Sequence, residues 1–285
     1  MSYDIYTGLL KAFPLPATMV NDVHFSYKNN HPKFDLLKRK HPIEAIAGDG
    51  DDFSKAKNLL NWVSGHIYHK GDFNGEAAYN SLDLLDHSFD KGSSCGINCV
   101  GLATILAESL LAIGLKARKV FIMPCSPYDG DNHVVTHVYI REKKKWVMFD
   151  PTYNAFFMNE QGECLSLLEL RANLADQKPV FINDEAKYND EIRTPESVGQ
   201  IIGYFAKNLF YFQTSEISTF GDRNAINNRF ISLSPHGFDP RQIRLSNIEY
   251  RIRKYGDSPN IQKWLKWAKR EEYAFCSTVA FERRP

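Results

Sequence analysis

Three residues with the chemistry of a cysteine nucleophile follow one another along the chain. Cys99 stands at the start of an apolar run with a helical pattern, and His133 and Asp150 lie on two strand-like segments after it. Unpaired backbone N–H groups at a helix start favour the thiolate, which is the reactive form of a thiol. A histidine can take the thiol proton, and a carboxylate can orient that histidine. The pattern therefore predicts a Cys-His-Asp triad and acyl chemistry.

The elements that must position these residues favour an α+β fold. Residues 100–113 are almost continuously apolar and end at Gly114, which indicates a buried helix. Strands are predicted over residues 118–123, 133–141 and 146–149. In an antiparallel pair with a tight turn, the start of one strand lies near the end of the next. His133 and Asp150 should therefore lie side by side at one end of an antiparallel sheet, with the cysteine helix packed on it.

The rest of the chain is expected to pack around this centre. We divide it into residues 1–54, a segment packed on the core; 55–157, the catalytic core; and 158–285, an extension or small subdomain. Further helices are predicted over residues 53–66, 80–89, 166–175, 198–212 and 261–273. The basic stretch 241–254 is interpreted as a solvated face. Five aromatic residues of the extension either wall the cleft or pack in the core: Tyr204, Phe205, Phe210, Tyr211 and Phe212.

Composition narrows the possible partners and the compartment. The 285 residues carry a formal net charge of +1, so no global field points to nucleic acid or to an anionic membrane, and neither is expected as a partner. No apolar stretch is long enough for a spanning helix. Five cysteines and no evident signal peptide favour reduced thiols and a cytoplasmic location. No glycine-rich phosphate loop occurs, and no cofactor is expected.

Three segments of the chain resemble the core of the transglutaminase-like superfamily, which has a papain-like fold. They are CVGLATILAESLLAIGLKARKV (99–120), HVVTHVY (133–139) and KWVMFDPTYN (145–154). That family carries a cysteine at the start of a core helix, an Ala-Arg pair after the helix-ending glycine, a strand that begins with histidine, and a Trp-containing strand that ends in Asp-Pro-Thr. The upstream stretch LLNWVSGHIYH (59–69) is similar to the helix that opens this domain. Bacterial proteins with this core are the expected relatives.

The resemblance implies a role for each member of the triad. Cys99 would be the nucleophile, His133 the general base and acid, and Asp150 the residue that orients the histidine. The expected substrate is a peptide, a protein, or a small amide or thioester, whose acyl group is hydrolysed or transferred. Two positions depart from the family pattern: Ile97 stands where a glycine is common, and His137 stands where an acidic residue is common.

Several assignments stay open. His137 is an alternative base on the same strand face, but it lies about 13 Å along the strand from His133, so only one of the two can reach Cys99. Cys95 is a competing thiol in a Ser/Gly loop, and Asn98 is a candidate oxyanion donor. A zinc site of the cysteines and His133 is disfavoured by the ligand spacing, and no metal is expected.

Two other functions remain possible at this stage. The first is a catalytically silent transglutaminase-like module that binds peptides or serves as a scaffold, because a fold alone does not prove chemistry. The second is an amide-forming acyltransferase of small-molecule biosynthesis. The oligomeric state stays open.

Overall fold

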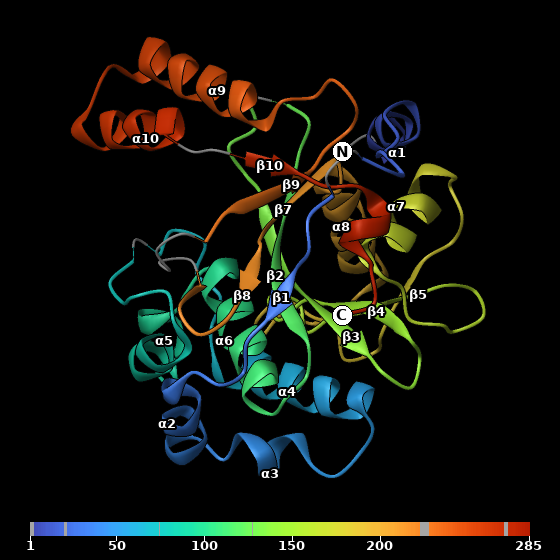
Figure 1. Ribbon diagram of the computed structural model, residues 1–285, viewed down its shortest axis with the longest axis vertical. Coiled ribbons are helices and arrows are strands. Elements are labelled where there is room, and N and C mark those ends of the chain that lie inside the picture. The colour runs from blue at the N-terminus through green and yellow to red at the C-terminus, as the bar shows by residue number, and fades with distance from the viewer. Residues whose placement is uncertain (1–2, 20–21, 74, 127, 223–227, 271–272) are drawn as a thin grey trace.

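The centre of the protein is a six-stranded sheet between two layers of helices (Figure 1). The computed structural model describes residues 3–19, 22–73, 75–126, 128–222, 228–270 and 273–285. The strands of this sheet are β2 (Ala117–Met123), β3 (His133–Ile140), β4 (Lys145–Phe149), β7 (Tyr211–Ser215), β9 (Phe230–Leu233) and β10 (Tyr273–Phe275). They lie in the order β10-β9-β7-β2-β3-β4. Neighbours are antiparallel, except for the parallel pair β9 and β10.

One layer is built around the helix α6 (Cys99–Ala112), which packs on β2 and β3. Every residue from Val100 to Ala112 is buried, as the apolar composition of this helix requires. Gly114 follows it with φ of +87°, a conformation that glycine adopts without strain and that ends many helices. The other helices of this layer are α2 (Pro32–Lys40), α3 (Ile43–Ala47), α4 (Asp52–His66) and α5 (Ser81–Ser88).

The opposite layer combines helices from the two ends of the chain with two from its middle. The terminal helices are α1 (Tyr3–Ala12) and α11 (Thr278–Phe281), and the other two are α7 (Leu167–Ala175) and α8 (Pro195–Asn208). Strand β3 is buried along its whole length because it lies between the two layers. Val134 and Val138 pack with the α6 layer, whereas Val135 packs in the cluster that holds Phe205 of α8, as the two-residue period of a strand dictates.

A helical hairpin projects from the edge of the sheet beside β10 (Figure 1). It consists of α9 (Pro240–Tyr255) and α10 (Pro259–Arg270), which pack on each other. The remaining elements are short: β1 (Ser26–Tyr27) pairs with β8 (Ile217–Ser218), β5 (Phe157–Met158) pairs with β6 (Phe181–Ile182), and η1 (Gly92–Cys95) is a single 3-10 turn. Within the described ranges, no helix has both the length and the apolar composition that crossing a membrane requires.

The α+β prediction is confirmed, and the three predicted strands are β2, β3 and β4. The helix predicted over 198–212 is wrong at its end: α8 stops at Asn208, and the aromatic residues that follow enter the sheet, where Phe212 pairs with Ile122. Aromatic side chains fit both a buried helix and a strand, so tertiary pairing decides between them. The helix predicted over 261–273 also ends early, because α10 stops at Arg270 and residue 273 belongs to β10.

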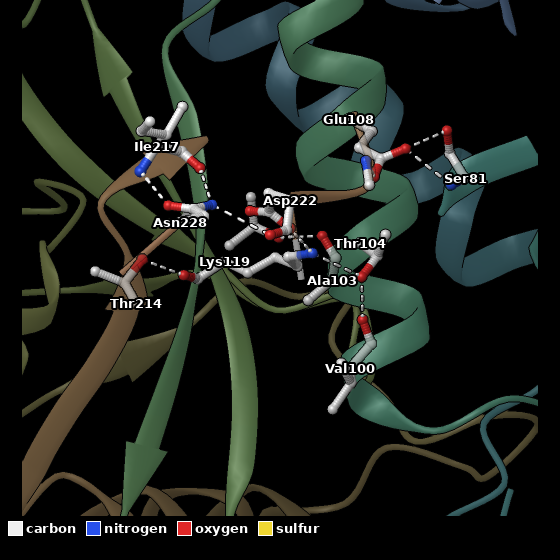
Figure 2. Close-up of polar contacts among 12 residues, drawn as sticks. Ser81, Val100, Ala103, Thr104, Glu108, Lys119, Thr214, Ile217, Asp222 and Asn228 are labelled. Atoms are coloured by element: carbon white, nitrogen blue, oxygen red, sulfur yellow. Dashed lines mark hydrogen bonds and ion pairs between the residues drawn. The ribbon is translucent and has the colours of Figure 1, made fainter. Parts of the chain in front are cut away.

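A buried polar network fixes α6 to its surroundings (Figure 2). The Glu108 carboxylate accepts hydrogen bonds from the backbone N–H and the hydroxyl of Ser81, at 2.8 and 2.6 Å, and from the Gly221 N–H at 2.9 Å. Burial raises the pKa of Glu108 to about 7, although Lys119 opposes this. Lys119 itself forms a buried ion pair with Asp222, at 2.5 Å. Charged groups therefore join the α6 layer, the sheet and the segment after β8.

The C-terminal segment is anchored through a buried arginine of β2. The Arg118 guanidinium stacks on the rings of Phe25, Trp146 and Phe281, at 4.6, 4.6 and 4.1 Å from the ring centroids. It also donates to the carbonyl oxygen of Phe281. The Trp146 indole N–H donates to the Arg283 carbonyl oxygen at 3.2 Å. The last turn of the chain is thus packed on strands whose other ends carry the candidate site.

Candidate active site

Cys99 occupies the exposed end of an otherwise buried helix. It is the first residue of α6, and its side chain is partly exposed while the rest of the helix is enclosed. Asn98 caps the helix, because its Oδ1 accepts a hydrogen bond from the Gly101 N–H at 3.1 Å. The thiol therefore lies where the positive end of the helix dipole favours negative charge on sulfur.

His133 and Asp150 lie together at one end of the sheet. His133 begins β3, and Asp150 follows the last residue of β4, the antiparallel neighbour. The His133 Nε2 lies 2.8 Å from the Asp150 Oδ2, and the two side chains are 3% and 0% exposed. The second carboxylate oxygen of Asp150 accepts from the Thr152 N–H at 2.9 Å. Both oxygens of the Asp150 carboxylate therefore have a partner, and the carboxylate fixes the orientation of the His133 imidazole.

The structure also brings Cys99 to His133. The Cys99 side chain is near enough to His133 to raise the pKa of the imidazole, and because Nε2 faces Asp150, Nδ1 is the ring nitrogen left for the sulfur. Burial lowers the pKa of His133, but the charge and hydrogen bond of Asp150, together with Cys99, raise it to about 10. The imidazole therefore carries a proton at neutral pH and forms the cationic partner that a thiolate needs.

His137 lies elsewhere in the fold. Its ring stacks with Phe281 and contacts Trp146, at centroid distances of 5.7 and 5.0 Å. Its Nδ1 lies 3.3 Å from the Arg118 Nη2, and its side chain is fully buried. Burial and the Arg118 charge hold its pKa well below the usual value, so it is neutral. Its described partners belong to the anchor of the C-terminal segment rather than to the surroundings of Cys99.

The other sequence candidates have separate positions. The Asn98 amide donates to the Tyr79 hydroxyl at 2.9 Å, so this side chain has partners at both of its polar atoms. Cys95 ends the turn η1, where the Ser94 hydroxyl lies 3.9 Å from its sulfur. Cys125 is partly buried, and burial raises its pKa. Among the described residues, no group of three or more His, Cys, Asp or Glu side chains has metal-binding geometry.

Aromatic side chains surround His133, and they come from segments that follow β4 in the chain. The rings of Tyr153, Tyr204 and Phe205 lie 5.8, 5.4 and 5.7 Å from the His133 ring. Burial raises the pKa of Tyr153, and so does the Asp150 charge; burial, with the charge of a nearby aspartate, does the same for Tyr204. Both phenols are therefore neutral. Of the five aromatic residues considered in the extension, Tyr204 and Phe205 contact the His133 ring, and all except Tyr204 are buried in the core.

A second histidine beside the site was missed in the sequence. Burial and the nearby His133 lower the pKa of His69 to about 4, so its ring is neutral. Its Nδ1 lies 2.8 Å from the Tyr188 hydroxyl, and Asn189 bonds both its backbone N–H and its carbonyl oxygen, at 2.8 and 3.2 Å. In the sequence, the only indication of a place near the site is that His69 ends the stretch 59–69. Nothing local links that stretch to residues 188 and 189.

An ion-pair cluster holds the loop that leads into His133. The Lys207 ammonium of α8 lies 2.9 Å from the Asp129 carboxylate and 3.1 Å from that of Asp131. The Tyr204 hydroxyl also contacts Asp131, at 3.2 Å. The loop immediately before His133 is therefore held against α8, the helix that carries Tyr204.

Part of the chain is similar to known proteins. The profile of the transglutaminase-like superfamily matches residues 40–151. Among solved structures, the chain is similar to a TGase at 20% identity over 43% of this chain and 34% of that chain, with a TM-score of 0.31. It is also similar to a protein from Cytophaga hutchinsonii described as a cysteine protease, at 16% identity over 60% of this chain and 55% of that one, with a TM-score of 0.32.

A third similar structure is the arylamine N-acetyltransferase of Nocardia farcinica, at 11% identity over 87% of this chain and 100% of that one, with a TM-score of 0.24. The match spans 34% and 55% of the lengths of the first two structures. No curated protein matches the chain. The family model thus matches the part of the chain that includes Cys99, His133 and Asp150, and members of that superfamily are commonly cysteine proteases or transglutaminases.

Proposed function

We propose that the protein is a cysteine-dependent acyl enzyme that hydrolyses or transfers a peptide or amide acyl group. Cys99 is the nucleophile, His133 the general acid and base, and Asp150 the residue that orients the imidazole. The observation that carries this proposal is the buried pair of His133 and Asp150, at 2.8 Å, beside a cysteine that begins a buried helix.

The reaction follows from these protonation states. The Cys99 thiolate attacks the acyl carbon, the carbonyl π electrons move to oxygen, and a tetrahedral oxyanion forms near the helix start. His133, which holds its proton with a pKa of about 10, donates that proton to the leaving amine or thiol as the bond to carbon breaks. The neutral imidazole then takes a proton from water or from an amine, which attacks the acyl-enzyme and releases Cys99.

The side chains around His133 also influence its charge and its accessibility. Tyr153, Tyr204 and His69 are neutral beside His133, so they leave Asp150 as the anion that pairs with its imidazolium. Their rings also limit the space in which an acceptor can approach the acyl group. Water as acceptor makes a hydrolase and an amine makes a transferase, and both modes share the same acyl-enzyme.

Alkylation and acylation of Cys99 test the proposal. Iodoacetamide near neutral pH should label Cys99 before Cys95, Cys125 and the two buried cysteines, with the site read by peptide mass spectrometry. S-phenyl thioacetate should leave an acetyl group on Cys99, and added amine should remove it as an amide if the protein is a transferase. Uniform slow labelling of the accessible cysteines would favour a catalytically silent binding module instead.

Substitution of the nucleophile provides the matching control. Cys99→Ala should abolish acetyl transfer and hydrolysis while the circular dichroism spectrum stays unchanged, because alanine fits the first turn of α6. Cys95→Ala should retain the wild-type rate. A Cys99→Ala variant with normal turnover would remove the acyl-enzyme mechanism.

A further inference from the structure

Positive charge is concentrated in the hairpin α9–α10. Residues 240–270 contain nine Lys and Arg residues and two acidic residues, a net charge of +7. Because the whole chain carries only +1, the remaining residues carry −6. Counting the flanking Asp239, Glu271 and Glu272 still leaves +4 on this segment. A nearly neutral protein thus has one strongly basic projection.

The described charges of this hairpin face solvent. Its described exposed basic residues are Arg241, Arg253, Lys254, Lys266 and Lys269. Among its described residues, only Pro240, Ile248 and Ala268 are buried. The two helices extend away from the sheet and from the α6 layer (Figure 1). These five basic groups are therefore displayed at the surface, whereas the half-buried Arg244 donates to Gln213 of β7.

The C-terminal half of α9 touches the loop that leads to His133. The Tyr250 ring packs edge-on against the Tyr128 ring, at a centroid distance of 5.0 Å. The Arg251 guanidinium lies so close to Gly130 that a β-carbon there would be 2.0 Å from its Nη2. The same loop continues through Asp131, which pairs with Lys207, into β3. A partner bound to the hairpin would therefore lie next to the segment that ends in the candidate catalytic histidine.

We infer that the hairpin α9–α10 is a docking surface for an acidic segment of a polypeptide. The charge of the segment meets the basic helices, and the adjoining part of the same polypeptide reaches the loop beside the site. Delivery of an acyl group to Cys99 rests on the proposed function, whereas the docking itself does not. Long-range attraction of this kind mainly raises the association rate and selects partners of opposite charge.

An acidic segment suits the charge distribution better than a polyanion of large extent. A nucleic-acid duplex or an anionic membrane would meet not only the hairpin but also the rest of the protein, whose residues carry a net charge of −6. A short acidic segment contacts the basic projection alone. The chemistry proposed for Cys99 also acts on a carbonyl of the kind that polypeptides carry.

Peptide binding tests the docking surface without any reaction. The probe is a fluorescein-labelled peptide of alternating Glu and Gly, and the matched peptide has Gln in place of each Glu; fluorescence anisotropy gives both affinities. The triple variant Arg253→Gln, Lys266→Gln, Lys269→Gln removes three charges from the hairpin. The control variant Lys33→Gln, Lys143→Gln, Lys144→Gln removes three exposed charges from distant surfaces.

The Glu peptide should bind and the Gln peptide should not. The hairpin variant should weaken binding of the Glu peptide about tenfold, since each exposed charge contributes a fraction of the free energy that a tenfold change requires. The control variant should bind like the wild type. Raising salt from about 0.05 M to about 0.5 M should abolish most of the binding, because screening shortens the range of the attraction.

Equal affinity for the two peptides, or equal effects of the two triple variants, would overturn the inference. So would tighter binding of an oligo-dT strand, or of phosphatidylserine vesicles, than of the Glu peptide. Acetylation of Cys99 by S-phenyl thioacetate should be unchanged in the hairpin variant, because this small donor does not use the surface. If the Glu peptide follows the hairpin charges but Cys99 is never acetylated, the docking surface stands and the proposed function fails.

Discussion

Replacing Asp150 by asparagine should remove the charge that keeps the His133 imidazole protonated beside Cys99. The pKa of His133 is raised from 6.5 to about 10, a difference that corresponds to about 5 kcal/mol in favour of the imidazolium. Asparagine retains the shape and a hydrogen-bonding oxygen but removes the charge. Burial then dominates and lowers the pKa below 6.5, so the ring loses its proton at neutral pH.

The rate of iodoacetamide alkylation measures this change directly. In the wild type the imidazolium persists up to about pH 10, so a cation lies beside the Cys99 sulfur throughout the range of about pH 6 to 9. In Asp150→Asn the rate near pH 7 should fall at least about tenfold, because the sulfur loses its cationic neighbour. Asp131→Asn is the matched control, because its carboxylate pairs with Lys207 instead. An Asp150→Asn variant that is alkylated at the wild-type rate near pH 7 would refute the reasoning.

The same linkage predicts the pH dependence of stability. Since the folded-state pKa of His133 is raised, its contribution is fully present below about pH 6.5 and is lost as the pH rises through about 10. The free energy of unfolding from urea titrations should therefore fall over this window by up to about 5 kcal/mol in the wild type. Asp150→Asn should show no such fall; a parallel decline in both proteins would assign it to other groups.

Three further substitutions test the supports of the site. Asp222→Ala leaves the Lys119 ammonium buried without an anion and should lower the free energy of unfolding by about 3–5 kcal/mol, and adding Lys119→Met should restore most of it; additive losses in urea titrations would contradict this. Asn98→Ala should cost about 1 kcal/mol through loss of the α6 cap, whereas Asn98→Ser should cost less, and equal melting temperatures for the two would speak against the cap. Arg118→Lys keeps the charge but cannot stack on three rings at once, so it should lower the free energy of unfolding by about 2–4 kcal/mol; wild-type stability would show that the stacking contributes nothing.

The parts of the site that sequence could predict are those carried by one helix and one tight hairpin. A continuous apolar run ends at Gly114, and this places Cys99 at a helix start. The turn between β3 and β4 is short, so antiparallel pairing alone puts His133 beside Asp150. Their meeting with Cys99 depends on how the helix lies on the sheet, which the resemblance to a known fold supplied as an expectation.

The aromatic wall could not be predicted in the same way. Tyr188 and Tyr204 come from segments with no local pattern that relates them to β3, and only the packing of α8 on the sheet brings Tyr204 to His133. His69 lies in an irregular segment, and its orientation depends on Asn189, far along the chain. Loops of this kind carry little signal, since their contacts rather than their propensities determine their paths.

The net charge of the whole chain does not reveal that basic residues are concentrated in one hairpin. The value of +1 argued against a charged partner, and the stretch 241–254 was interpreted as a solvated face. Its exposed basic residues do face solvent, but their separation from the acidic remainder becomes meaningful only when the hairpin is seen to project beside the loop that precedes His133. An average over the whole chain cannot report such a separation.

The sheet has a consequence for the order of events during translation. Strand β2 is flanked by β3 on one side and by β7 on the other, and its Arg118 is covered by Phe281. A nascent chain that has reached residue 157 would expose an apolar strand edge and a charged side chain that later sequence is needed to cover. At roughly 5–20 residues per second the ribosome takes several seconds or more to supply that cover. The polypeptide is therefore expected to need protection from aggregation, or a chaperone, until residues 273–283 emerge.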